Sequence, residues 1–214
     1  MKIVDDHLGL YLRGWSITLL LTSVSFAVAL VIGLLLASAR VSPVAPLRGL
    51  ARWYVELVRN TPLTVHMVLM FFGLPKLGIR FGPITTAILV LSIYTGAFVG
   101  EVIRSGINTI GVGQIEAGRA IGLPFTGLLR LIVIPQALRA TVAPLGSQLS
   151  ALVRNSAVAY TISVLDIMGR SDRLITDLAR PIPILIGAAL AYYTLTIPLA
   201  VAINAVDRRV RGSR

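Results

Sequence analysis

The amino-acid sequence predicts an all-α membrane protein with five transmembrane helices. Of its 214 residues, 56% are hydrophobic and only 14% are charged, whereas about 25% of the residues in a typical soluble domain carry a charge. The mean hydropathy is +0.84, and three uncharged segments each reach the roughly 20 residues that a membrane-spanning helix needs. The sequence contains no solenoid-type repeat and no low-complexity segment, so we expect one membrane domain over residues 1–214.

The first, third and fifth spans follow directly from the uncharged segments. We expect them over residues 14–39, 82–104 and 181–206. Charged residues stand near both ends of each segment, and the apolar stretch between them covers about 30 Å of hydrocarbon at 1.5 Å per residue.

The second and fourth spans contain charges. The second is expected over residues 55–75, which draws Glu56 and Arg59 into the edge of the membrane. The fourth is expected over residues 131–163, a stretch that contains two prolines and the basic residues Arg139 and Arg154. Proline is tolerated in a membrane helix when neighbouring groups satisfy the freed carbonyls. An ionisable side chain deep in a span is a candidate for function.

Five spans place the two termini on opposite sides of the membrane. With the N-terminus outside, the inner segments carry twelve basic residues and the outer segments carry seven. The inner ones are Arg40, Arg48, Arg52, Arg59, Arg104, Arg119, Arg130, Arg139 and the four arginines of the tail; the outer ones are Lys2, Arg13, Lys76, Arg80, Arg170, Arg173 and Arg180. Cytoplasmic segments carry the excess of arginine and lysine, so we expect the N-terminus outside and the C-terminus in the cytoplasm.

Several function classes are disfavoured by the sequence. There is no cysteine, which removes disulfides and thiolate metal sites. The arginines are scattered between apolar segments, as expected of membrane-flanking charge rather than of a nucleic-acid interface. Neither Lys2 nor Lys76 lies in a phosphate-binding glycine loop, and no catalytic or metal motif occurs. We therefore expect no enzyme activity, no bound metal and no ATP site in this chain.

A short polar segment between the third and fourth spans is expected to form a helix over residues 113–122. Its core, from Gln114 to Ile121, carries Glu116 and Arg119 at a spacing of three, which allows them to pair. Gly122 suits the left-handed position after a helix, and Pro124 prevents continuation. A helix this short is marginal alone. The residues leave two interpretations open: a docking surface built on small side chains, or a simple turn between spans.

The sequence around this helix resembles a known family. The segments EAGRAIG and IVIPQALR resemble the cytoplasmic loop motif of permease subunits of bacterial ABC importers. The motif has Glu-Ala-Ala, three residues, Gly, and later Ile-x-Leu-Pro; here Gly118 replaces the second Ala and Ile134 replaces Leu. Segments 55–75, 94–114 and 135–156 are similar to the branch that transports polar amino acids, and the resemblance covers about residues 14–205.

The resemblance implies a transport mechanism with partner proteins. It makes the short helix a coupling helix, which docks on a separate cytoplasmic ATPase and transmits its closure to the membrane part. The family's coupling residues correspond to Gln114, Glu116, Ala117, Gly118, Arg119, Ala120 and Gly122. The implied assembly pairs the chain with a second permease of the same or a sister type. Two ATPase copies hold ATP and Mg²⁺, an extracytoplasmic binding protein delivers the amino acid, and the whole sits in a bacterial cell membrane.

An amino acid crossing the membrane needs polar partners near the midplane, because its charges cannot cross hydrocarbon unpaired. The expected pathway residues are Arg154, Asn155, Ser156, Tyr160, Tyr94, Thr95, Glu101 and Thr61. Two interpretations of Arg154 stay open: a pathway cation, or an ion-pair partner of Glu101 or Glu56. Arg59-Asn60-Thr61-Pro62 resembles the family's Arg-Gly-Thr-Pro, with Pro62 bending the second helix near its cytoplasmic end and Thr61 bonding the freed carbonyl.

The transported amino acid is only weakly indicated. Asn60, where the family has Gly, is similar to glutamate-type members and favours a glutamate-like or glutamine-like substrate. The alternative function is a secondary transporter or channel subunit driven by an ion gradient, with Glu101, Arg154 and His66 as relay groups. A membrane scaffold without transport would explain the spans but not a charge deep in the fourth one.

Overall fold

The computed structural model describes residues 7–212, and helices account for all of the regular structure in that range. The elements are α2 (Leu8–Val41), α3 (Ala45–Arg59), α4 (Leu63–Val68), η1 (Leu69–Gly73), η2 (Leu74–Leu77), α5 (Pro83–Asn108), α6 (Val112–Ala120), α7 (Phe125–Leu128), η3 (Leu129–Val133), α8 (Ile134–Asn155), η4 (Ser156–Ile162), α9 (Ile167–Leu178) and α10 (Pro181–Gly212). The predicted all-α class is confirmed. Lys2 and Arg214, counted above among the flanking charges, lie outside the described residues.

Four stretches of the described chain are long and apolar enough to cross a membrane. They are Leu8–Val41, Pro83–Asn108, Phe125–Ile162 and Pro181–Val210. A fifth crossing is formed if Ala45–Arg59 and Leu63–Leu77 count as one span, although these two helices meet at an angle of 101°. The described chain is therefore a multi-pass membrane protein, and its helix count agrees with the five spans that the sequence predicts.

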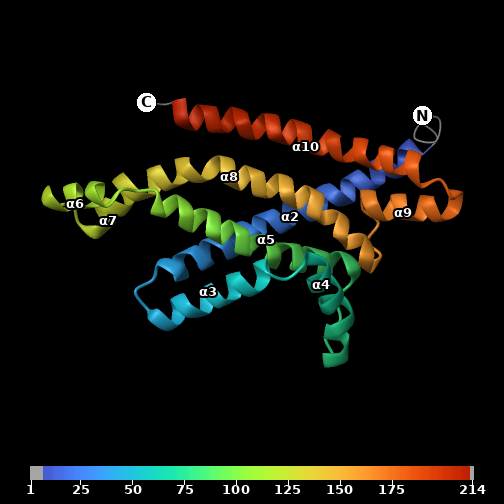
Figure 1. The fold of residues 1–214 in the computed structure, drawn as a ribbon, viewed down its shortest axis with the longest axis horizontal. Helices are drawn as coiled ribbons and strands as arrows, with labels where there is room; N and C mark the ends of the chain where they lie inside the picture. Colours follow the sequence, from blue (N-terminus) through green and yellow to red (C-terminus); the bar gives the residue numbers. More distant parts are fainter. Residues whose placement is uncertain (1–6, 213–214) are drawn as a thin grey trace.

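The second span differs from its expected form. Its helix begins at Ala45 instead of near Val55, so the break follows 15 helical residues of α3 and does not lie at the helix start. Pro62 has no backbone N–H and adopts an extended ψ of 137°, which stops the α-helical hydrogen bonding. Thr61 donates its hydroxyl to the carbonyl of Leu57 at 2.9 Å. This is a back-bond of the predicted kind, but its acceptor lies one residue before Val58, whose carbonyl Pro62 leaves without a donor. Beyond the break, α4 turns away from the long axis of the bundle (Figure 1).

The close packing of α2 on α5 rests on small residues. Gly96 and Gly100 of α5 stand four residues apart, and they face α2 around Gly33. A Cβ added at Gly100 would lie 3.0 Å from the Cβ of Leu36 and 3.2 Å from the carbonyl oxygen of Gly33. Lipid supplies no hydrophobic driving force between helices, so such backbone proximity provides the packing contacts that hold spans together.

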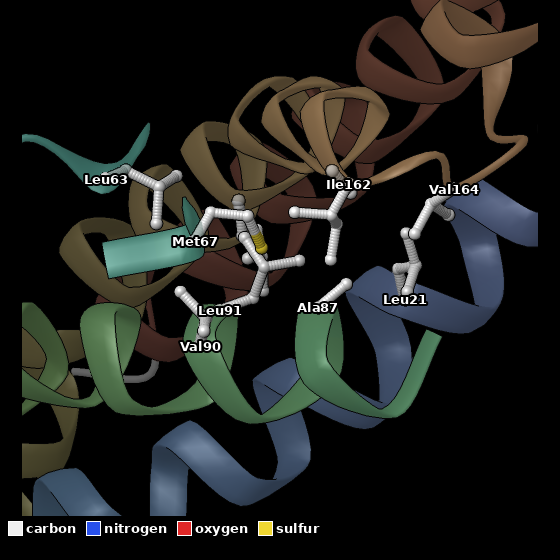
Figure 2. Packing of buried hydrophobic residues seen from close by; sticks show 10 residues of the cluster. Leu21, Leu63, Met67, Ala87, Val90, Leu91, Ile162 and Val164 are labelled. Atoms are coloured by element: carbon white, nitrogen blue, oxygen red, sulfur yellow. The ribbon is translucent and has the colours of Figure 1, made fainter. Parts of the chain in front are cut away.

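A buried apolar cluster holds the bent α4 against the bundle. Leu63 and Met67 of α4 pack with Leu91 of α5, and Ile162 of η4 closes the same cluster (Figure 2). Met67 and Leu91 are fully buried. Met70 and Phe71 of η1 are half-buried and pack against the same cluster. The cluster is therefore the anchor of the broken span.

The fourth span begins earlier than expected. It starts at Phe125, not near residue 131, and includes α7, the π-helical turn η3, α8 and the 3-10 turn η4. Pro135 lies at the start of α8 directly after the π-turn. Because proline cannot donate to the carbonyl of Leu131, widening of the preceding turn is the usual accommodation.

The two ends of the bundle carry different elements. α6, α7 and the C-terminal end of α10 lie at one end, whereas the start of α2 and α9 lie at the other (Figure 1). With the orientation predicted from the arginines, the first end is cytoplasmic and the second is extracytoplasmic. The short helix expected between the third and fourth spans thus protrudes at the cytoplasmic end.

Candidate functional site

The protruding helix α6 ends in a well-formed C-terminal cap. Gly122 adopts a φ of +80°, and its N–H donates to the carbonyl of Arg119 at 2.9 Å. The N–H of Leu123 donates to the carbonyl of Gly118 at 3.0 Å. This pair of bonds is the Schellman arrangement, and it confirms the left-handed conformation expected of Gly122. α7 then begins directly after Pro124.

Gly118 faces its own chain. Its backbone is buried, and a Cβ there would meet Leu128 at 2.5 Å and Ile132 at 2.8 Å. The expectation that Gly118 makes room for a partner is therefore corrected: it lets α6 lie flat on the start of the fourth span. The exposed coupling-motif residues are Gln114, Glu116, Ala117, Arg119, Ala120 and Gly122.

Two polar contacts of α6 also differ from expectation. No ion pair among residues 7–212 joins Glu116 to Arg119, so these two side chains do not pair as their spacing suggested. Gln114 instead accepts a hydrogen bond from Gln136 Nε2 at 2.6 Å. The charges of Glu116 and Arg119 consequently remain free for an external partner, while Gln114 ties α6 to α8.

A cavity of 270 Å³ lies between α5 and α8. It is lined by Tyr94, Thr95, Phe98, Gln148, Ala151 and Asn155. Tyr94, Thr95 and Asn155 were predicted from the sequence, whereas the other three residues were not. A helical spacing could have revealed Gln148, because it lies seven residues before Asn155 and therefore on the same face of α8.

Aromatic rings and one arginine border this cavity. The rings of Tyr94 and Phe98 lie 5.1 Å apart, and His66 meets Tyr94 edge-on at 5.9 Å. The guanidinium carbon of Arg59 lies 5.2 Å from the centroid of the Phe98 ring, a cation–π distance. The cavity thus offers amide and hydroxyl groups on an aromatic wall, with the arginine behind it. None of its lining side chains among residues 7–212 is charged.

The remaining predicted pathway residues lie outside the cavity lining. The Thr61 hydroxyl donates to the carbonyl of Leu57, and the hydroxyl of the buried Ser156 donates to the carbonyl of Val153 at 2.9 Å. Tyr160 is exposed, and Glu101 pairs with Arg40 at 3.6 Å and with Arg104.

Arg154 does not form the ion pair that the sequence left open. Glu101 is held by Arg40 and Arg104, and Glu56 pairs with Arg52 at 2.8 Å. Arg154 itself is exposed on α8, one residue before Asn155. Within the described range, its guanidinium therefore projects from the surface of a span without a carboxylate beside it.

Asp166 connects helices at the extracytoplasmic end and was not predicted from the sequence. It caps α9 by accepting the Gly169 N–H at 2.8 Å, and it accepts the Tyr192 hydroxyl at 3.1 Å. The residue is fully buried, and this burial raises the pKa of its carboxyl to about 6, against the lowering effect of its hydrogen bonds. An aspartate directly before an amphipathic segment is an N-cap signal that could have revealed it.

Comparison with known proteins identifies the family. Residues 29–212 match the family model described as "Binding-protein-dependent transport system inner membrane component". The chain belongs to this family. The probable glutamine ABC transporter permease protein GlnM of Bacillus subtilis is 34% identical over 213 residues, covering 100% of this chain and 99% of the relative. The glutamate transport system permease protein GluC of Corynebacterium efficiens is 34% identical over 207 residues, 91% of each chain.

A solved structure supports the same assignment. The chain matches a chain from the "Crystal structure of an amino acid ABC transporter with histidines" with a TM-score of 0.91 and 28% identity, covering 96% of both chains. The resemblance stated from the sequence is thus confirmed: the chain is a permease subunit of an amino acid ABC importer.

Proposed function

We propose that this permease passes a polar amino acid, glutamate-like or glutamine-like, through the membrane by alternating access. In this proposal a separate cytoplasmic ATPase supplies the energy and docks on α6. The assembly contains two ATPase copies, which hold ATP and Mg²⁺, and a second permease of the same or a sister type. An extracytoplasmic binding protein delivers the amino acid, and the complex resides in a bacterial inner membrane.

The observation that carries the coupling role is the exposed face of α6. Ala117 and Ala120 present little side chain, so a partner's surface can approach the helix backbone closely. The Schellman cap and the contact of Gly118 with Leu128 and Ile132 hold α6 rigidly against the start of the fourth span. A push on α6 is therefore carried into the helix that lines the cavity, as rigid-body transitions require.

The chemistry of the cavity supports the substrate class. Gln148 and Asn155 each offer an amide donor and an amide acceptor, and Thr95 adds a hydroxyl. These groups can pair with the carboxylate, ammonium or carboxamide of a small polar amino acid. The volume of 270 Å³ lies near the lower end of the roughly 300–1,000 Å³ of ligand sites, which suits a small solute.

The exposure of Arg154 supports the presence of a second permease chain in the complex. Its guanidinium is exposed on the fourth span, and a charge facing hydrocarbon is costly. A second chain placed against α8 would turn this exposed position into the wall of a shared, water-filled pathway. There Arg154 would attract the substrate carboxylate, next to Asn155.

Reconstitution tests the proposal. The permease complex is placed in liposomes with its binding protein outside and ATP inside, and uptake of labelled glutamine, glutamate, arginine and cystine is compared. We expect ATP-dependent uptake that survives ionophores, with glutamine or glutamate competing best. Uptake driven by an ion gradient without ATP would overturn the proposal in favour of a secondary transporter.

Two variants on α8 test the cavity. Gln148→Ala removes an amide from the cavity, whereas Ser147→Ala changes its exposed neighbour, which does not line the cavity. Loss of one hydrogen bond to a polar solute costs about 1–2 kcal/mol, so Gln148→Ala should slow ATP-driven uptake about tenfold. Ser147→Ala should transport normally. Equal rates in the two variants would remove this cavity from the pathway.

A further inference from the structure

Three arginines gather at the extracytoplasmic end of the bundle. Arg170 and Arg173 belong to α9, and Arg13 belongs to the start of α2. Arg13 and Arg173 are exposed, whereas Arg170 is half-buried. The Nε atom of Arg170 is buried and has no hydrogen-bond partner among the described residues. We call these three residues the outer arginine cluster.

The outer arginine cluster is electrostatically unfavourable as it stands. Burial lowers the pKa of the Arg170 guanidinium, and the charges of Arg13 and Arg173 lower it further. None of the ion pairs formed within residues 7–212 involves a member of the cluster. Arg170, the fourth residue of α9, also lies near its N-terminus, where the helix dipole disfavours cations. An anion bound from outside would offset the mutual repulsion of these three positive charges.

The cluster stands on a rigid support. Asp166 binds both the start of α9 and Tyr192 of α10. The Ile167 N–H donates to the Thr18 hydroxyl of α2 at 3.3 Å, and a Cβ at Gly14 would lie 2.9 Å from the Cα of Ile167. α9 is thus fixed to the first and last spans, and its arginines are held in place rather than free to fold back.

The support also connects the cluster to the cavity. The fourth span runs through α8 and η4 and turns into α9 within a few residues. In that turn Ser163 adopts a φ of +66°, and a Cβ at Gly169 would lie 2.0 Å from the Val164 carbonyl oxygen. The linker is therefore tightly packed, and a force on α9 acts on the helix that carries Gln148 and Asn155.

We propose that the outer arginine cluster docks an acidic surface of the extracytoplasmic binding protein. This inference rests on the proposed function. Three observations favour this partner over other anions. The cluster lies at the end opposite α6; the family is described as binding-protein-dependent; and the rigid linker gives docking a route to the cavity. Carboxylates on the partner would pair with the exposed guanidinium groups of Arg13 and Arg173.

A titration of ATPase activity tests the inference. The complete complex in nanodiscs of zwitterionic lipid is titrated with the purified binding protein of the same transport system. The readout is the concentration that gives half-maximal stimulation. Arg173→Glu and Arg13→Glu should each raise this concentration about tenfold at low salt, since like charges at an interface repel. The increase should shrink at high salt. Arg209→Glu, an exposed arginine at the cytoplasmic end, is the matched control and should behave as wild type.

The outcomes separate this inference from the proposed function. If the binding protein stimulates the wild-type complex and the cluster variants need no more of it, the inference is wrong and the function stands. If the binding protein never stimulates the wild type, the proposed function itself fails. Two results would contradict docking of the binding protein on the cluster. A defect of Arg173→Glu that is seen only with anionic lipid would assign the cluster to lipid headgroups. An Asp5→Asn/Asp6→Asn variant with the same defect as Arg173→Glu would assign it to the carboxylates of this chain.

Discussion

Replacing Gly122 by valine should uncouple the permease from its ATPase without disturbing the fold of the spans. Gly122 holds a φ of +80°, and a side chain there would meet nothing within 4 Å. The cost is therefore purely conformational, about 1–2 kcal/mol for an L-residue in this region. α6 has only nine residues and is marginal by itself. Loss of its cap should lower the ratio of ordered to disordered α6 by about five- to thirtyfold.

The assay is stimulation of ATP hydrolysis by loaded binding protein in proteoliposomes. Gly122→Val should reduce stimulation severalfold, whereas Gly122→Asn should lose little, because asparagine tolerates the left-handed conformation. Gly113→Val is the matched control: it lies in the same helix, in open space and without a positive φ. Equal stimulation in Gly122→Val and wild type, at equal amounts of assembled complex, would refute the assignment of α6 as the coupling element.

Three further predictions concern stability. Burial raises the pKa of Asp166 from 3.8 to about 6, so the folded protein binds the proton of this carboxyl more tightly than the unfolded chain does. The free energy of unfolding should therefore fall by at most about 3 kcal/mol as pH rises from about 4 through 6. Thermal unfolding in detergent should show this decline, and Asp166→Asn should flatten it; an unchanged slope would contradict the assignment. Gly100→Val should cost about 1–3 kcal/mol by overpacking α2 against α5. Gly49→Val, in open space on α3, should leave stability unchanged or raise it by less than about 1 kcal/mol, because valine has a higher helix propensity than glycine; similar unfolding temperatures for the two variants would disprove the packing argument. Glu101→Gln removes the partner of Arg40 and Arg104 and should lower stability by about 1–3 kcal/mol, which the same thermal assay would detect; no loss would mean that the two arginines are solvated.

Local signals in the sequence predicted the short helix well. The left-handed position of Gly122 and the stop at Pro124 depend on neighbours within one turn, so residue types alone indicate them. The packing of Gly118 could not be predicted in this way. A glycine in a helix permits close approach, but which surface approaches is decided by Leu128 and Ile132, which follow after the chain has reversed direction.

Contacts between distant segments limited the prediction of the pathway. Tyr94 and Thr95 were recognised by their chemistry, whereas Gln148 needed knowledge of which face of α8 meets α5. Glu101 resembled a pathway carboxylate because nothing in the sequence places Arg40 beside it, 61 residues earlier. The bend at Pro62 was expected, yet the start of its helix was missed, because the arginines of α3 resemble a loop between spans until α3 packs on α2 and α5.

Cross-linking from α6 tests the central claim most directly, that this helix is the docking site of the ATPase. The chain contains no cysteine, so single cysteines can be introduced at the exposed residues Ala117 and Ala120, and at Thr176 on α9 as a control. A short thiol-to-amine cross-linker should join both α6 cysteines to the ATPase in the assembled complex and should leave Thr176→Cys unlinked. An intact complex in which Ala117→Cys and Ala120→Cys fail to link to the ATPase would contradict the account.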